Sequence, residues 1–169
     1  MNELKWQIAR EAPHLRRFSI ALTGDRDAAD DLVQDCLARA LRKRHLWHRR
    51  GSLRSWLFRI LYRLYLDRRR APSPEVGVPM EFLAARSVQP ANQEARAEYR
   101  QVIAGLSRLP VEQRAAILTV ALEGLSYDEA ASALGIPIGT LRSRLSRGRE
   151  TLRRTMSATS KAPPLRRIK

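Results

Sequence analysis

Four polar side chains between residues 138 and 152 have the types and spacing needed to read a DNA duplex. Arginine can donate two hydrogen bonds to guanine, and serine can bond to either a base or a phosphate. Apolar residues recur every three or four positions in this segment, which predicts a helix with one face packed on the preceding helices. The polar side chains that project away from that face are Arg142, Ser143, Ser146 and Arg147.

The residues just before this segment predict the element that would position it. Ser126 and Glu129 have the S-x-x-E spacing of a capping box, which predicts a helix beginning at Tyr127. Gly135 suits a left-handed helix end, and Pro137 suits the first turn of the next helix. A solvated amphipathic helix would explain the arginines alone. The capped partner helix and the glycine turn favour a helix-turn-helix that enters a DNA major groove.

The charge of the whole chain points to a nucleic-acid partner. The 169 residues include 32 Lys and Arg against 17 Asp and Glu, a net charge of +15. Lys and Arg gain affinity for phosphates by releasing counterions. A membrane surface also attracts basic charge, but no long amphipathic helix with aromatic anchors serves that role. No signal peptide or membrane-length apolar run is present, so we expect a cytoplasmic protein without direct membrane insertion.

No group of residues indicates catalytic chemistry. The sequence has no glycine-rich phosphate loop, no spaced set of cysteines and histidines, and no nucleophile beside a base. His45 and His48 are close in sequence, but no cysteine or carboxylate accompanies them as a metal ligand. The single cysteine, Cys36, lies in an apolar stripe, so we expect a buried structural thiol in a reducing compartment. We therefore expect no catalytic residues, no metal and no cofactor.

The periodicity of apolar residues is helical nearly throughout, and no convincing alternating strand is present, which predicts an all-α fold. Four prolines interrupt residues 72–92, which we interpret as an extended linker. We predict two small helical domains, residues 1–71 and 93–156, joined by this linker, and a basic, disordered tail at 157–169. Each domain has a marginal core on its own, so docking onto a partner would stabilise it.

Residues 22–41 are acidic in an otherwise basic chain. A spacing of four predicts a buried helix face made of Ala28, Leu32, Cys36 and Ala40, which Val33 and Leu37 widen. Carboxylates are favoured near a helix N-terminus, which explains Asp27 and Asp30 but explains Asp35 less well. Charge alone leaves two interpretations open, a helix start or a docking surface for a basic protein. The candidate docking residues are Asp31, Gln34 and Asp35.

Residues 51–70 interleave aromatic rings with arginines. Aromatic rings stack on unpaired bases, and cations follow the backbone of a single strand. Each aromatic residue taken alone, such as Phe58, is more simply explained as part of the core. The spacing leaves both roles open for the candidate single-strand contacts Trp56, Arg59, Tyr62 and Arg63.

Three blocks of this sequence together resemble the extracytoplasmic-function (ECF) sigma factors of bacterial RNA polymerase. Residues 22–41 resemble the polymerase-binding helix of the sigma-2 domain, and residues 52–70 resemble the adjoining helix that melts and reads the −10 element. Residues 109–152 resemble the sigma-4 domain, which reads the −35 element. The order of the blocks and the proline-containing linker also fit, and the match covers nearly the whole chain.

The resemblance implies partners for each candidate site. Asp31, Gln34 and Asp35 match positions that dock on a coiled-coil of the largest subunit of core RNA polymerase, and the flap region is a further polymerase contact. The linker would thread the polymerase channel and place Glu81 and Phe82 inside the enzyme. Single-stranded −10 DNA would meet residues 56–63, duplex −35 DNA would meet residues 142–147, and a cognate anti-sigma factor would cover these faces.

The sequence departs from the family at one −10 position, and other classes of protein remain to be weighed. Arg63 stands where the family usually has an asparagine that helps to read a flipped-out base, so we expect altered −10 selectivity. One alternative is a sigma-like decoy that sequesters an anti-sigma factor, but such decoys usually carry a receiver domain and lose the basic recognition residues. A helix-turn-helix repressor would not need the acidic strip, and a DNA-processing enzyme would need a set of metal-binding carboxylates.

Overall fold

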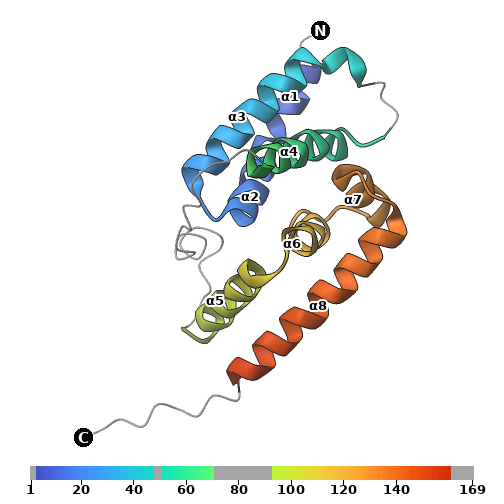
Figure 1. Ribbon diagram of the computed structural model, residues 1–169. Coiled ribbons are helices and arrows are strands. Elements are labelled where there is room, and N and C mark those ends of the chain that lie inside the picture. The colour runs from blue at the N-terminus through green and yellow to red at the C-terminus, as the bar shows by residue number, and fades with distance from the viewer. Residues whose placement is uncertain (1–2, 48–50, 71–92, 161–169) are drawn as a thin grey trace, which may run out of the picture.

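The structure is a computed structural model that describes residues 3–47, 51–70 and 93–160, and this part of the chain is helical without a strand, as predicted. The first lobe contains α1 (Glu3–Arg10), α2 (Ala12–Thr23), α3 (Arg26–Arg42), the short 3-10 turn η1 (Arg44–Leu46) and α4 (Leu53–Arg70). The second lobe contains α5 (Gln93–Arg108), α6 (Val111–Ile117), the π-helical turn η3 (Leu118–Leu122), α7 (Tyr127–Leu134) and α8 (Ile138–Ser160). Figure 1 shows α8 as a long helix along the outer edge of the second lobe.

The structure confirms the predicted helix-turn-helix: the capping box, the left-handed helix end and the start of the second helix are all present. The backbone N–H of Glu129 donates to Ser126 Oγ at 3.2 Å, and the N–H of Ser126 donates to Glu129 Oε2 at 3.0 Å. That second bond is the main reason why the pKa of Glu129 is lowered, so the cap is present at neutral pH and is lost as the pH falls through this lowered pKa. Gly135 ends α7 with φ of 65°, and α8 begins at Ile138, one residue after Pro137.

Helix α3 begins at a cap and buries a slightly different face from the predicted one. The Asp25 side chain caps α3 by accepting from the N–H of Ala28 at 2.8 Å. Ala28 itself is exposed, and the buried face consists of Ala29, Leu32, Val33, Cys36 and Ala40. The prediction of Ala28 was wrong because a strict spacing of four drifts about 40° around a helix at every step. Cys36 is buried as expected, its Sγ donates to the carbonyl of Leu57 at 3.4 Å, and burial raises its pKa to about 12.

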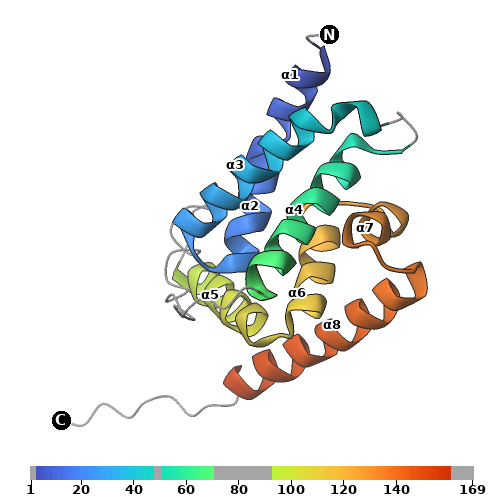
Figure 2. The same ribbon diagram turned by 45° about the horizontal axis from the view of Figure 1, so that its top comes forward.

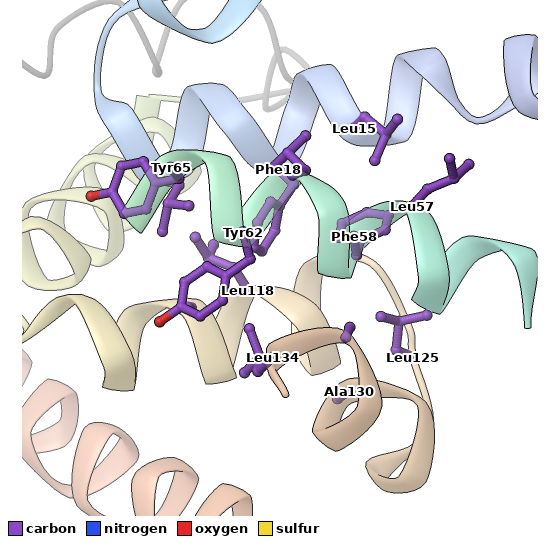
Figure 3. Packing of buried hydrophobic residues seen from close by; sticks show 14 of the residues in the cluster. Leu15, Phe18, Leu57, Phe58, Tyr62, Tyr65, Leu118, Leu125, Ala130 and Leu134 are labelled. Atoms are coloured by element: carbon purple, nitrogen blue, oxygen red, sulfur yellow. The ribbon is translucent and has the colours of Figure 1, made fainter. Parts of the chain in front are cut away.

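The two lobes pack directly on each other, a contact that the sequence did not predict. Figures 1 and 2 show α7 of the second lobe lying beside α4 of the first, and α6 and η3 contact α2. Buried side chains from both lobes form one continuous cluster, in which Tyr62 of α4 faces Leu118 and Leu134 (Figure 3). The reason lies in α4, which buries apolar residues on two sides, one against α3 and the other against α7.

Some boundaries differ from the prediction or lie outside the described residues. Helix α8 continues to Ser160, four residues into the segment that we expected to be a disordered tail. No glycine or proline interrupts the sequence before Pro163, so nothing in it ends the helix at 156. The predicted linker 72–92 with Glu81 and Phe82, and His48, lie outside the described residues. None of the described helices is long and apolar enough to cross a membrane.

A glycine brings α8 unusually close to α6. A Cβ built on Gly148 would lie 2.8 Å from Ile117 Cδ1 and 3.3 Å from Gln113 Cβ. We expect Gly148→Ala to lower the free energy of unfolding by about 1 kcal/mol, because overpacking outweighs the gain in helix propensity. Gly139→Ala is the control, since that exposed position in α8 has no atom within 4 Å of a built Cβ. It should raise stability by about 0.5 kcal/mol. Urea unfolding measures both, and equal shifts would contradict the close approach.

Candidate DNA and polymerase interfaces

Helix α8 presents the four predicted DNA-reading residues on one exposed face. The opposite face is anchored in the core by Leu141 and Leu145, which are almost completely buried. Ser143 Oγ donates to the carbonyl of Thr140 at 2.9 Å, so its lone pairs remain available to accept a hydrogen bond. The predicted residues that the structure places together in solvent are Arg142, Ser143, Ser146 and Arg147.

The basic face of α8 extends further along the helix than these four residues. A cavity of about 410 Å³ lies between α8 and the start of α7, where Tyr127 is exposed. Its polar lining, three arginines and one serine, follows a spacing of four, three and four residues along α8, a pattern that could have been found in the sequence. Glu150 partly neutralises this end, because it pairs with Arg153 and, at 3.0 Å, with Arg154. The residues of α8 on this stripe are Arg142, Ser146, Arg149 and Arg153.

The acidic strip lies on the exposed side of α3, away from its buried face. Asp31, Gln34 and Asp35 are all exposed, as predicted. Asp35 Oδ2 accepts a hydrogen bond from Arg68 Nη2 of α4 at 2.6 Å, so this carboxylate already has a cation beside it. Within the described parts of the chain, no hydrogen bond or ion pair is made by the side chains of Asp31 and Gln34. Asp31 and Gln34 are therefore available to contact a partner, whereas Asp35 is already paired with Arg68 of α4.

Neighbouring Asp30 has a structural role. Arg16 of α2 donates to both of its carboxylate oxygens, at 2.6 and 3.0 Å. The hydrogen bond from Arg16 is the main reason why the pKa of Asp30 is lowered. This pair ties α2 to α3 within the first lobe.

Three of the four predicted single-strand contacts surround one cavity of about 270 Å³. Trp56 is half-buried there, while Arg59 and Arg63 are exposed. The cavity lies between α4, the end of α3 and η1, and its remaining lining comes from Arg39, Lys43, Leu46 and Ile60. An aromatic ring among four cations around a partly apolar cavity fits an unpaired base with its flanking phosphates.

The fourth residue, Tyr62, is elsewhere. Only 3% of its surface is exposed, and it lies under the second lobe, where burial raises the pKa of its phenol. In this arrangement no DNA base can reach its ring. Arg59 lies at the edge of the same contact, since its Nε is 3.9 Å from the position of a Cβ built on Gly135. Of the four predicted residues, Trp56, Arg59 and Arg63 therefore line the open cavity, whereas Tyr62 is buried where the two lobes meet.

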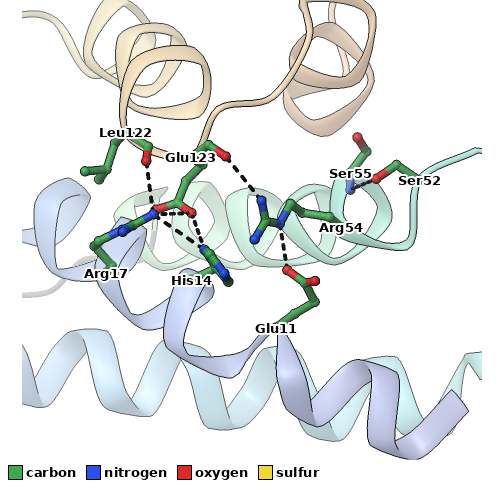
Figure 4. A network of polar contacts seen from close by, with 8 residues as sticks. All are labelled: Glu11, His14, Arg17, Ser52, Arg54, Ser55, Leu122 and Glu123. Atoms are coloured by element: carbon green, nitrogen blue, oxygen red, sulfur yellow. Dashed lines mark hydrogen bonds and ion pairs between the residues drawn. The ribbon is translucent and has the colours of Figure 1, made fainter. Parts of the chain in front are cut away.

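A polar network that sequence reasoning missed closes the boundary between the lobes (Figure 4). Its centre is Glu123, which follows η3 and has no exposed side-chain surface. Arg17 of α2 donates to both carboxylate oxygens of Glu123, at 2.9 and 3.1 Å, and to the carbonyl of Leu122 at 3.0 Å. His14 Nδ1 lies 3.1 Å from Glu123 Oε2. A buried carboxylate is thereby held by two side chains of the other lobe.

Two further side chains of α4 bond across the same boundary. Arg54 donates across the boundary to the carbonyl of Glu123 at 3.2 Å, and it also donates to Glu11 Oε2 of its own lobe at 2.7 Å. Ser55 Oγ donates to the carbonyl of Glu129 in α7 at 3.1 Å. No local pattern in the sequence predicts these contacts between the lobes, because the partners are 69 to 109 residues apart. The described residues contain no group of three or more His, Cys, Asp or Glu that could hold a metal ion.

Comparison with known proteins matches both lobes. Residues 8–62 match the family described as the sigma2 domain of PhyR, and residues 99–152 match sigma-70 region 4. The ECF RNA polymerase sigma factor EcfG of Rhodopseudomonas palustris is 38% identical over 155 residues, which cover 89% of this chain and 83% of that protein. The chain belongs to the ECF sigma factor family. The first lobe is therefore a sigma-2 domain and the second a sigma-4 domain.

Solved structures agree with this assignment. The sigma factor RpoE of Bartonella quintana, crystallised with the anti-sigma factor NepR, has a TM-score of 0.74 and 32% identity, and the match covers 93% of this ECF sigma factor and 98% of that chain. The anti-anti-sigma factor PhyR of the same organism, in complex with NepR, has a TM-score of 0.62 at 19% identity, over 91% of this chain and 51% of that one. The likeness to PhyR is one of fold alone.

Proposed function

We propose that this ECF sigma factor binds core RNA polymerase and directs initiation at promoters by recognising −10 and −35 elements. The observation that carries the proposal is the presence of two exposed surfaces of opposite charge on different lobes. The acidic strip on α3 suits a basic protein surface, whereas the basic face of α8 suits DNA phosphates and bases. A protein that binds only DNA would have no use for the acidic surface. The factor supplies recognition, and the polymerase supplies the chemistry.

We assign each surface to a partner. Asp31, Gln34 and Asp35 contact the coiled-coil of the largest polymerase subunit, and the sigma-4 domain lies near the flap region. The cavity beside Trp56 receives the unpaired −10 strand with Arg59 and Arg63, and Tyr62 joins that surface once the lobes separate. The face of α8 from residue 142 to 147 enters the major groove of the −35 duplex. We place the domain boundaries at 1–71, 72–92 and 93–156.

An anti-sigma factor is a further proposed partner. The relative RpoE was crystallised with the anti-sigma factor NepR, and it matches this chain over nearly its whole length. We propose a partner of that kind here, and we place the protein in the cytoplasm, associated with the nucleoid when it is bound to polymerase. The alternative function is a sigma-like decoy for an anti-sigma factor. The match of residues 8–62 to the sigma2 domain of PhyR is the observation that favours it.

Run-off transcription separates these functions. Purified core polymerase is given a supercoiled library of upstream regions, with and without this protein. We expect initiation at a defined set of sites, and loss of initiation with Asp35→Lys, because a reversed charge would repel the basic surface of the polymerase. Absence of initiation together with tight binding to an anti-sigma factor would refute the sigma function and support the decoy.

The −35 assignment predicts a selective effect of Arg147→Ala. An arginine that reads a base contributes about 1–3 kcal/mol of discrimination, so the variant should lose preference at one −35 position and keep its affinity for other sequences. Binding to a panel of −35 duplexes with single substitutions measures this effect. Arg154→Ala is the control, since Arg154 lies beyond the predicted face and is paired with Glu150. A uniform loss of affinity would reassign Arg147 to a phosphate, and no loss would contradict the interface.

A further inference from the structure

The cavity beside Trp56 is lined by four cations and by no acidic residue. Within the described parts of the chain, none of the four makes a hydrogen bond or an ion pair. Other arginines of the first lobe have carboxylate partners, such as Arg16 with Asp30 and Arg54 with Glu11. Like charges around one cavity repel each other, so this cavity is suited to an anion that carries several charges. The four cations are Arg39, Lys43, Arg59 and Arg63.

The same cavity also has an apolar side. Trp56 and Ile60 of α4 are half-buried there, and Leu46 of η1 is exposed at its edge. Sites for small ligands usually have volumes of about 300–1,000 Å³, so a cavity of about 270 Å³ is at the small end of that range. A single base with a few phosphates fits this size, this ring and this charge.

A base with phosphates can come from a DNA strand or from a free nucleotide. A strand carries about one negative charge per nucleotide, so a base inserted from it is flanked by about two charges. A free nucleoside diphosphate carries about three negative charges on adjacent phosphates, because its terminal phosphate is nearly doubly ionised at neutral pH. Four cations without partners around one cavity match the more concentrated charge of the free nucleotide.

We propose that the cavity beside Trp56 binds a free nucleoside di- or triphosphate, with the base against Trp56 and the phosphates against the four cations, and that this nucleotide competes with the −10 strand. Recognition of −10 DNA then depends on the concentration of free nucleotides. The competition rests on the proposed function of the cavity. Binding of the nucleotide does not, and it can be measured without DNA.

Calorimetric titration of the full chain tests the ligand class. The probes are ADP and ATP, together with adenosine, which lacks the phosphates, and pyrophosphate, which lacks the base. We expect ADP to bind at least about ten-fold more tightly than either adenosine or pyrophosphate, because base and phosphates are linked and bind to two sides of one cavity. Pyrophosphate that binds as tightly as ADP would reduce the site to a general attraction of anions to a basic chain.

Two arginines in the last turn of α3 provide a matched pair of variants. Arg39 lines the cavity, whereas Arg42 is exposed in the same turn and does not line it. Arg39→Gln should weaken ADP binding about three- to five-fold, the upper range for one partly exposed ionic contact. Arg42→Gln makes the same change in net charge and should weaken it less than about two-fold.

Substitutions of Trp56 test the position of the base. Trp56→Ala should weaken ADP binding at least about five-fold, because one aromatic ring that stacks on a base contributes that much or more. Trp56→Phe keeps a ring, so calorimetry should find an affinity within about two-fold of the parent protein. ADP should quench the tryptophan fluorescence of the parent protein but not that of Trp56→Phe. This variant also serves if Trp56→Ala fails to fold by circular dichroism.

Competition between ADP and labelled DNA completes the test. The DNA probes are the non-template −10 strand and the −35 duplex of a promoter found by the transcription experiment. ADP should displace the −10 strand at the concentrations at which it saturates the protein in calorimetry. It should leave the −35 duplex bound, because the proposed −35 face lies on α8, outside the lining of this cavity.

Three further results would overturn the nucleotide site. Equal losses of ADP affinity in Arg39→Gln and Arg42→Gln would show that net charge alone attracts the nucleotide. Unchanged ADP affinity in Trp56→Ala would place the base elsewhere. Simultaneous binding of ADP and the −10 strand would show that the two ligands do not share the cavity. Failure of the proposed function is distinguishable, because a protein that never initiates transcription would still bind ADP with the same dependence on Arg39 and Trp56.

Discussion

Replacing Phe58 with alanine is expected to lower the free energy of unfolding by about 3–5 kcal/mol, the usual range for removing a buried phenylalanine. Phe58 is 1% exposed, and its ring meets that of Phe18 edge to face with 5.0 Å between centroids. Its other side lies toward Leu125 and Ala130 of the second lobe (Figure 3). The substitution therefore leaves a cavity where α2, α4 and the sigma-4 domain meet.

Chemical denaturation followed by circular dichroism measures this loss. Trp56→Ala is the matched control, because Trp56 is an aromatic residue of the same helix that is only half-buried and lines the open cavity. It should lose less stability than Phe58→Ala, and it should lose affinity for the −10 strand while the fold persists. A larger stability loss for Trp56→Ala than for Phe58→Ala would contradict the division of α4 into a core face and a DNA face.

Replacing Asp31 with lysine is expected to weaken binding to core polymerase at least about 30-fold, or about 2 kcal/mol, because the new cation would face the basic surface that the strip is proposed to contact. Asp31 is exposed in the first half of α3 and makes no hydrogen bond or ion pair with the described residues, so the change should not disturb the fold. Binding of the isolated sigma-4 domain to −35 DNA does not involve this residue.

Competition with a labelled sigma factor for core polymerase measures the loss. Glu3→Lys is the control, because it makes the same change in net charge at an exposed position on α1. It should compete nearly as well as the parent protein. Normal competition by Asp31→Lys would show that the acidic strip is not the docking surface, and equal losses in both variants would point to net charge instead of a specific contact.

Features that depend on neighbours in the sequence could be predicted. The capping box of Ser126 and Glu129, the left-handed Gly135 and the exposed face of α8 all follow from residues within a few positions of one another. The exposed positions of Asp31 and Gln34 also follow from helical periodicity alone. Such local rules fix where a helix begins, where it ends and which face is buried.

Contacts between distant segments could not be predicted in the same way. Arg17 and Glu123 are 106 residues apart, and neither belongs to a pattern that marks it as one of a pair. Asp35 was predicted as an exposed docking residue, but its partner Arg68 is 33 residues away on another helix. Tyr62 shares its spacing with the α4 residues that are proposed to face DNA, and only the second lobe places it in the core.

The π-helical turn η3 is a further feature without a sequence signal. Thr119 Oγ1 donates to the carbonyls of Ala115 and Ala116, at 3.0 and 2.9 Å, inside a run of apolar residues. Threonine bonds of this kind bend helices, and a π-turn widens the helix by one residue. The effect here is to bring Leu122 and Glu123 to the surface of the sigma-4 domain that faces Arg17.

The single core shared by both lobes also has a consequence for how this factor would compete for polymerase. If the closed arrangement is favoured by about 2.7 kcal/mol, about 1% of free molecules are open, and a partner that needs open lobes binds about 100-fold more weakly than the contacts alone would allow. Substitutions at the lobe boundary would then change occupancy of the polymerase without touching its binding surface. If polymerase binding requires separated lobes, the buried Glu123 would set a cellular concentration of this factor below which other sigma factors keep the enzyme.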